Sequence, residues 1–216
     1  MIGLLKNTNL MKKNLFNYEV SDLVVNRNGK RRLATKDVVS TELKQQFKLM
    51  LQCFKNAIKR ANEKIADIAP GAMSRNHYPS LVQTTLFEQF VLNKELNAKK
   101  GKNGRTVMVI LDYVILSKLL DKNSKPMNIK TLSVNDILSQ KSNALSLYDG
   151  ESPILFFGYK KDKFGAYVDP QLVYIDENKV KFSITEQDIQ MDLFMNNTPD
   201  ELNIVEVKPT LKRKAQ

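Results

Sequence analysis

One pattern of apolar residues constrains this fold more than any other feature. Between residues 40 and 69 they recur every three or four positions, and the opposite face is rich in lysine. This spacing is typical of a helix with one buried face. Ser40 suits the N-cap and Pro70-Gly71 ends the pattern, so the sequence predicts an amphipathic helix of about seven turns. Its apolar positions are Leu43, Phe47, Met50, Phe54, Ala57, Ala61, Ile65 and Ile68.

A second helix is predicted after the proline-bounded loop at 70–79. Ser80 and Gln83 have the spacing of a capping box, with Ser80 as N-cap and Gln83 at the third helical position. The helix is expected to run from Leu81 to about Ala98. Its buried face is predicted to hold Leu86, Phe87, Phe90, Val91 and Leu96.

The next apolar segment, 106–120, has no clear period. It fits one buried helix, or a strand followed by a short helix, and periodicity does not separate the two. We favour a strand at 106–111 and then a helix to Leu120. One or two further short helices are expected between Ser133 and Leu147, with Ser133 as N-cap and Asp136 at the third helical position.

From Ser152 onward the apolar period changes to two. The segments PILFFGY, GAYVD, QLVYID and KVKFSIT are rich in aromatic and β-branched residues, and KKDKFG, DP and ENK separate them as turns. This pattern predicts a small antiparallel meander of three or four strands at 152–186.

Helices first and strands later favour the α+β class. The sequence predicts long amphipathic helices in the N-terminal two-thirds and a small β-meander in the C-terminal third. The expected organisation is an N-terminal arm (1–39), an α+β body (40–195, helical over 40–148) and an extended C-terminal arm (196–216).

Charge is distributed unevenly along the chain, whose net charge is +11. Residues 1–130 hold 24 Lys and Arg against 10 Asp and Glu, whereas residues 131–216 hold 10 against 13. Such asymmetry is typical of contact with a polyanion, or with complementary surfaces of other copies or partners.

Three clusters carry much of the positive charge: NRNGKRR at 26–32, AKKGKNGR at 98–105 and KRK at 212–214. Asn28-Gly29 favours a tight turn, so the first cluster could form the loop of a hairpin. Aromatic residues are not interleaved with the clusters, which favours backbone contact over base stacking. Contact with nucleic acid or an acidic partner is predicted for Arg27, Lys30, Arg31, Arg32, Lys99, Lys100, Lys102, Arg105, Lys212, Arg213 and Lys214.

The sequence offers little for catalysis or metal binding. A single cysteine, Cys53, and a single histidine, His77, cannot form a disulfide or a four-ligand Cys/His zinc site. Cys53 is expected to be a buried structural thiol and not a nucleophile paired with His77. GKNGRT at 101–106 lacks the glycine spacing of a phosphate-binding loop. We therefore expect a non-enzymatic protein without cofactor, metal or evident small-molecule substrate.

One short segment does resemble a catalytic signature. Pro199-Asp200 followed by IVEVK at 204–208 resembles the motif of the PD-(D/E)xK nuclease family. The resemblance implies a divalent metal on Asp200 and Glu206, with Lys208 polarising the attacking water. It covers only 199–208, and it stands as an alternative together with sequence-nonspecific nucleic-acid binding.

The layout of the whole chain, a compact body between two polar arms, resembles tailed-bacteriophage virion proteins of the head–tail connector or accessory capsid type. That resemblance implies an assembly role in which the arms dock on other copies or other subunits, with DNA as a further contact through backbone charge. The implied location is the virion, or otherwise the cytoplasm. No apolar run reaches the roughly 18 residues of a membrane span, and the first residues do not read as a secretory signal.

Overall fold

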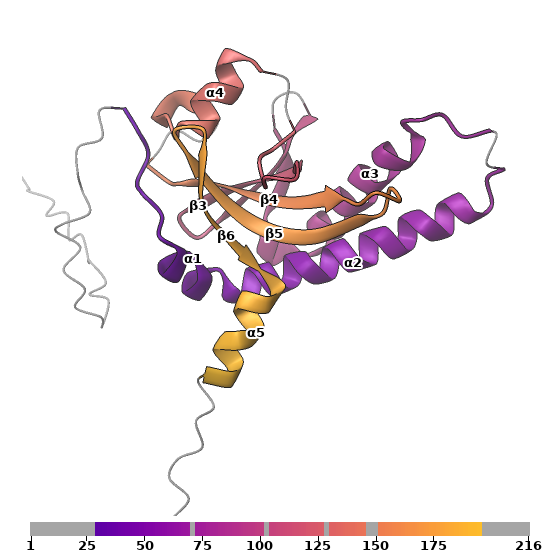
Figure 1. Ribbon diagram of the computed structural model, residues 1–216, viewed down its shortest axis with the longest axis horizontal. Coiled ribbons are helices and arrows are strands. Elements are labelled where there is room, and N and C mark those ends of the chain that lie inside the picture. The colour runs from indigo at the N-terminus through magenta and orange to yellow at the C-terminus, as the bar shows by residue number, and fades with distance from the viewer. Residues whose placement is uncertain (1–28, 70–71, 102–103, 128–129, 146–150, 196–216) are drawn as a thin grey trace, which may run out of the picture.

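The molecule is built around one mixed six-stranded sheet (Figure 1). A computed structural model describes residues 29–69, 72–101, 104–127, 130–145 and 151–195. The strands are β1 (Ala98–Lys100), β2 (Thr106–Ile110), β3 (Tyr113–Leu119), β4 (Ile154–Lys161), β5 (Tyr167–Asp176) and β6 (Lys179–Thr185).

The strands lie in sequence order, and every neighbouring pair is antiparallel except β3–β4, which is parallel. A parallel pair needs a crossover, because its second strand must start at the same end of the sheet as the first. The crossover here contains a short helix. The helices are α1 (Lys36–Glu42), α2 (Lys44–Ala66), α3 (His77–Leu92), α4 (Leu132–Leu138) and α5 (Glu186–Met195), with 3₁₀ turns at Lys94–Leu96 (η3) and Ser142–Ala144 (η5).

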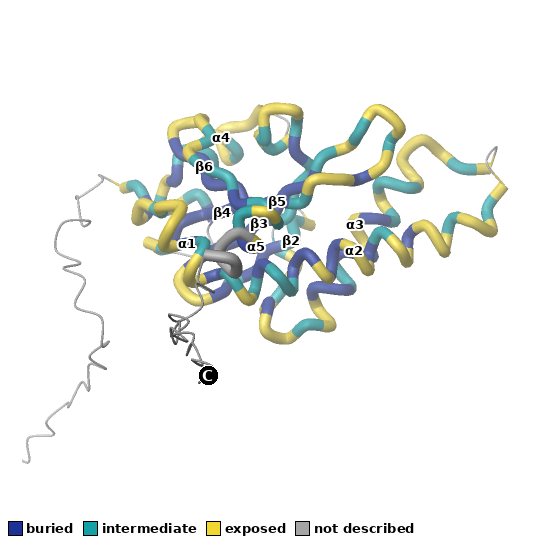
Figure 2. The backbone as a smooth tube through the Cα atoms, turned by 60° about the horizontal axis from the view of Figure 1, so that its bottom comes forward, coloured by how far each residue is buried: buried dark blue, intermediate teal, exposed yellow. Residues whose placement is uncertain are grey.

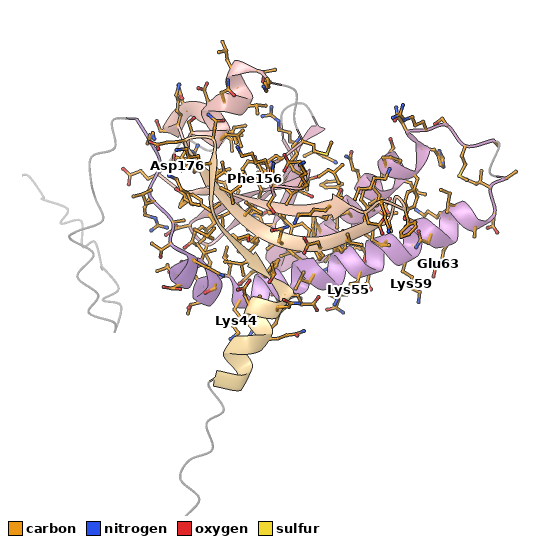
Figure 3. All side chains as sticks on the ribbon, viewed as in Figure 1. Lys44, Lys55, Lys59, Glu63, Phe156 and Asp176 are labelled. Atoms are coloured by element: carbon orange, nitrogen blue, oxygen red, sulfur yellow. The ribbon has the colours of Figure 1, made fainter. Side chains whose placement is uncertain are left out.

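The larger core lies between the sheet and the pair α2–α3. The Phe157 ring meets the rings of Phe47, Phe54 and Phe90 edge-on, with centroids 5.6–6.4 Å apart. This arrangement is the favoured one for aromatic pairs because it brings a ring edge against a ring face. The predicted apolar stripe of α2 therefore faces the sheet, whereas Lys55, Lys59 and Glu63 lie on the opposite side of the helix (Figure 3).

A smaller core covers the other face of the sheet. Phe156, which Figure 3 labels in the middle of the sheet, packs there with Leu116, Val173 and Ile137 of α4. Successive residues of β4 thus enter different cores, because side chains alternate across a strand. Figure 2 shows the buried residues concentrated in the sheet and along the inner side of α2.

The α+β class is confirmed, but the separation into a helical part and a C-terminal meander is wrong. β4, β5 and β6 do follow one another as antiparallel neighbours, yet β1, β2 and β3 complete the same sheet from within the segment predicted to be helical, 40–148.

The segment 106–120 is a hairpin and not a strand followed by a helix. β2 and β3 pair from Val107–Leu116 to Ile110–Tyr113, and Leu111, with φ 49°, helps to form the two-residue turn between them. Both faces of the hairpin are covered, so its strands lack the alternation of apolar and polar residues that reveals a half-buried strand.

The predicted helix boundaries also need correction. Ser40 lies inside α1 and donates its hydroxyl to the Asp37 carbonyl, so it is not an N-cap. α3 begins at His77, before the predicted capping box, because Pro79 falls in its first turn, where a missing N–H costs nothing. Val91 is 47% exposed instead of buried.

In the C-terminal part of the described chain, two features differ from the prediction. Asp169-Pro170 does not end a strand: Asp169 has φ 58°, and β5 continues through it opposite a register shift between Gly158 and Lys160. α5 follows β6 directly. The Thr185 N–H donates to the Asp188 carboxylate at 2.8 Å, as in a capping box.

Candidate anion-binding surface

The first basic cluster is largely structural. The Arg31 side chain is fully buried and donates to the carbonyls of Lys141, Ser142 and Ser152 at 3.1, 2.8 and 3.0 Å. A buried guanidinium is tolerated only where hydrogen bonds replace its hydration. The prediction that Arg31 contacts an external partner is therefore wrong, because its donors hold two loops of its own body together.

Its neighbours differ from each other. Lys30 forms an antiparallel bridge with Lys141, and its amine lies 2.9 Å from Glu177 and 3.5 Å from Asp176. Arg32 is exposed, with its guanidinium carbon 5.9 Å from the centre of the Tyr113 ring. The sequence assigned residues 30–39 to the N-terminal arm, but in the structure they pack on the body.

The topology of the sheet brings a different set of cations together. β1 ends, β2 begins, β3 and β4 end and β5 begins at the same end of the sheet, where Figure 1 shows the β4–β5 bend at the right. We call the residues 99–105, 118–125 and 160–169 there the basic end. Its described cations are Lys99, Lys100, Arg105, Lys118, Lys122, Lys125, Lys160, Lys161 and Lys163.

Three carboxylates accompany these nine cations. Asp121 accepts the N–H groups of Asn123 and Lys125, both at 2.8 Å, and so closes the turn after β3. Asp162 holds the β4–β5 turn in the same way, and Asp169 pairs with Lys160 at 2.7 Å. Within the described residues, the other eight cations have no carboxylate ion pair, so the surface keeps a marked positive charge.

Lys118 lies at the centre of this surface. The β2–β3 register, carried two residues past Val107–Leu116, places Arg105 opposite Lys118, while Gly158 of β4 lies on the other side. Partial burial lowers the pKa of Lys118, and the nearby Arg105 charge lowers it further. A bound anion would oppose both effects, and perturbed groups of this kind are enriched at functional sites.

The two lysines of β1 point to opposite faces of the sheet. Lys99 is opposite Val107, on the face of Arg105 and Lys118. Lys100 reaches toward the helices, with its amine 4.1 Å from the centre of the Phe87 ring, and burial lowers its pKa. Of the predicted contact residues, Lys99, Lys100 and Arg105 therefore lie at the basic end.

Other predicted contact residues lie outside the described part of the chain, namely Arg27, Lys102, Lys212, Arg213 and Lys214. The nuclease-like residues Pro199, Asp200, Glu206 and Lys208 lie outside it as well.

Six lysines of the basic end were missed by sequence reasoning. They occur in LSKLLDKNSK at 116–125 and in YKKDKFG at 159–165, segments whose composition indicates loops and turns. The usable signal was the coincidence of lysines with predicted strand ends. The missed residues are Lys118, Lys122, Lys125, Lys160, Lys161 and Lys163.

Cys53 and His77 are not brought together. The Cys53 thiol is buried against the carbonyl of Gln89 at 3.5 Å and accepts from the Asn93 amide at 3.1 Å. Burial raises its pKa, which disfavours the reactive thiolate. His77 is twelve residues from Gln89 on α3, about 18 Å along the helix axis.

A groove of about 390 Å³ between α2 and α5 has an apolar floor of Leu51 and Ile189 and a rim that includes Lys48, Lys55 and Glu186. The described residues contain no group of three or more His, Cys, Asp or Glu that could hold a metal ion. None of the helices they form is both long and apolar enough to cross a membrane.

Comparisons of the chain with models of protein families, with curated protein sequences and with solved structures find no match.

Proposed function

We propose that this protein is a non-enzymatic component that binds nucleic acid through its phosphate backbone, without reading sequence, and that the basic end is the contact surface. The observation that carries the proposal is the gathering of nine cations from three separate loops, of which only Lys160 has a carboxylate ion pair among the described residues.

The size of the surface suits a nucleic-acid backbone. It extends from β1 to β5, four inter-strand spacings of about 4.8 Å, or about 19 Å. Each strand of a duplex carries one phosphate per about 3.4 Å of helix axis, so about five phosphates of one strand fall within this length when the axis runs along the surface. Flexible lysines on several loops can follow an irregular backbone, because each ammonium acts as a point charge on a long stem.

The test removes three exposed lysines from different loops, Lys99→Ala, Lys122→Ala and Lys161→Ala, in one variant. We expect weaker binding to random-sequence duplex DNA, measured by fluorescence anisotropy between 50 and 200 mM salt, conditions across which affinity through several phosphates changes strongly. The log–log slope of affinity against salt should become shallower by about 2.7, which is 0.9 for each lost contact.

A matched control removes the same charge elsewhere. Lys141→Ala, Lys179→Ala and Lys181→Ala lie near the opposite end of the sheet, and the whole chain keeps the same net charge as in the test variant. Equal weakening by both variants would show that total charge, and not this surface, controls binding. A wild-type protein that binds only an acidic protein ligand, and no DNA, would overturn the proposal.

The arm-docking hypothesis concerns the predicted arms, residues 1–39 and 196–216, of which 1–28 and 196–216 lie outside the described part of the chain. An assembly role of the phage-virion kind stays a prediction, and it is compatible with a body that contacts packaged nucleic acid. Light scattering of the full chain with and without DNA would test for the expected oligomer.

A further inference from the structure

A large aromatic side chain is exposed at the β4–β5 side of the basic end. Phe164, at the tip of the β4–β5 hairpin, is 84% exposed. Lys161 and Lys163 precede it closely in the chain, and both are exposed. The amine of Lys163 lies 4.9 Å from the centre of the Phe164 ring, a cation–π distance.

The loop presents this ring in an ordered way. The Asp162 carboxylate accepts the N–H groups of Phe164 and Ala166, both at 2.8 Å, and the Asp162 N–H donates to the Ala166 carbonyl at 2.9 Å. Gly165 has φ 91°, a conformation that suits glycine. The bonds fix the turn without burying Phe164, so little ordering of the loop is needed for the ring to bind a ligand.

The base of the hairpin is anchored to the helices. Tyr167 packs on Tyr159 and on Tyr78 of α3, with ring centroids 5.4 and 5.7 Å apart, and Tyr159 packs on Phe54 of α2 at 5.2 Å. The neighbouring aromatic side chains of this hairpin thus have structural partners. Phe164 differs from them, because it is largely exposed and, among the described residues, its ring contact is with Lys163.

We propose that Phe164 stacks on an unpaired base and that the basic end therefore prefers single-stranded nucleic acid to duplex. This inference rests on the proposed function and names its ligand class. A planar ring beside two exposed lysines matches a strand whose bases are free and whose phosphates are regularly spaced. In a duplex, neighbouring bases occupy the stacking faces, and the lysines alone would contact the backbone.

Substitution with alanine tests the role of the ring. We expect Phe164→Ala to weaken binding of a 12-nucleotide oligo(dT) by about 5- to 150-fold, the range for loss of one stacked base. Affinity for a 12-base-pair duplex and the salt slope should stay unchanged, because no charge is removed. Phe164→Tyr should retain the affinity for oligo(dT), and Leu132→Ala, which removes an 83% exposed side chain from α4, is the control for loss of apolar surface.

A direct readout is available because the chain contains no tryptophan. Phe164→Trp introduces a single tryptophan, whose emission should be quenched by oligo(dT) and much less by duplex. Leu132→Trp should respond to neither. Both proteins should show the circular dichroism of the wild type.

The outcomes separate the two proposals. Equal binding of oligo(dT) by wild type and Phe164→Ala, together with a steep salt dependence, would overturn stacking and leave backbone binding intact. Absence of binding to both nucleic acids would overturn both proposals. If Phe164→Ala weakened the binding of oligo(dT) and of duplex equally, the result would also contradict the inference, since it would indicate a general apolar contact.

Discussion

The two ends of the sheet use their cations differently. At one end, the paired end, residues 29–32, 136–142 and 176–181 come together, and Lys30, Lys141 and Lys181 form ion pairs with acidic residues. Arg31 is buried there on three carbonyls. At the basic end, only Lys160 among the described cations has a carboxylate ion pair.

This difference separates two roles of positive charge. Arg31 closes the fold because it satisfies carbonyls that burial has removed from water. The exposed lysines of the basic end, such as Lys99, Lys122 and Lys161, remain hydrated and carry like charge, so they are not expected to stabilise the fold. Positive charge at the paired end is thus mainly structural, whereas at the basic end it is available to a ligand.

The largest expected effect on stability is at the paired end. Arg31→Ala should lower the free energy of unfolding by about 3–5 kcal/mol, because three hydrogen bonds from a charged, buried donor are lost, each worth about 1.5 kcal/mol or more. The carbonyls of Lys141, Ser142 and Ser152 would lose their donors. Urea denaturation measures the change. The exposed neighbour Arg32 provides the control, and an equal cost for Arg32→Ala would remove the contrast between structural and free cations.

A second prediction concerns the strand that joins the two ends. A Cβ at Gly158 would overlap with the Leu120 side chain, which packs over it. Gly158→Ala should cost about 1–3 kcal/mol, as overpacking of a core does. Because Leu120 leads into the loop that carries Lys122 and Lys125, the variant should also weaken DNA binding. If stability falls and DNA binding does not, the position of the loop that carries Lys122 and Lys125 does not matter for DNA binding.

Loss of the N-terminal cap of α5 should lower the free energy of unfolding by a smaller amount, and this amount should depend on pH. Burial would raise the pKa of Asp188, but the hydrogen bonds from Lys36 and from the Thr185 N–H and hydroxyl outweigh it and lower the pKa. The carboxylate therefore stabilises the fold fully above its ordinary pKa of 3.8, and this contribution is lost as the pH falls through the lower folded-state value.

Asp188→Ala should accordingly cost about 1 kcal/mol at pH 7, the usual value for loss of a cap. Thermal unfolding of wild type and variant at pH 7 and at pH 3 would measure it. The difference between the two proteins should become smaller at pH 3, and a difference that grows on acidification would contradict the assigned role.

The smallest change in stability is expected at the basic end. The triple variant of Lys99, Lys122 and Lys161 should unfold within about 0.5 kcal/mol of the wild type, as surface substitutions usually do. This result, beside the loss of DNA binding, would complete the contrast with Arg31. A loss of several kcal/mol would show that these lysines, too, hold the fold together.

Local patterns in the sequence predicted several elements correctly. The stripe from Leu43 to Ala61 predicted the buried face of α2, because helical spacing depends only on residues close in the chain. Aromatic and β-branched residues between turn signals predicted β4, and alternation predicted β6. The turn at Glu177-Asn178 has the two positive φ angles, 53° and 59°, that a tight hairpin needs. The β2–β3 hairpin was misread because burial on both faces removes that alternation.

The sequence by itself determined the amphipathic helix, the late strands and a large positive charge. Only the tertiary structure decided which cations are buried, paired or gathered on one surface. Arg31 and Arg32 are adjacent and identical in type, yet carbonyls contributed by residues 141, 142 and 152 bury the first and not the second. Likewise, the parallel pairing of β3 with β4 brings lysines more than forty residues apart, such as Lys118 and Lys160, to the same end of the sheet. Long-range pairing of strands sets these neighbours, and local spacing carries no record of it.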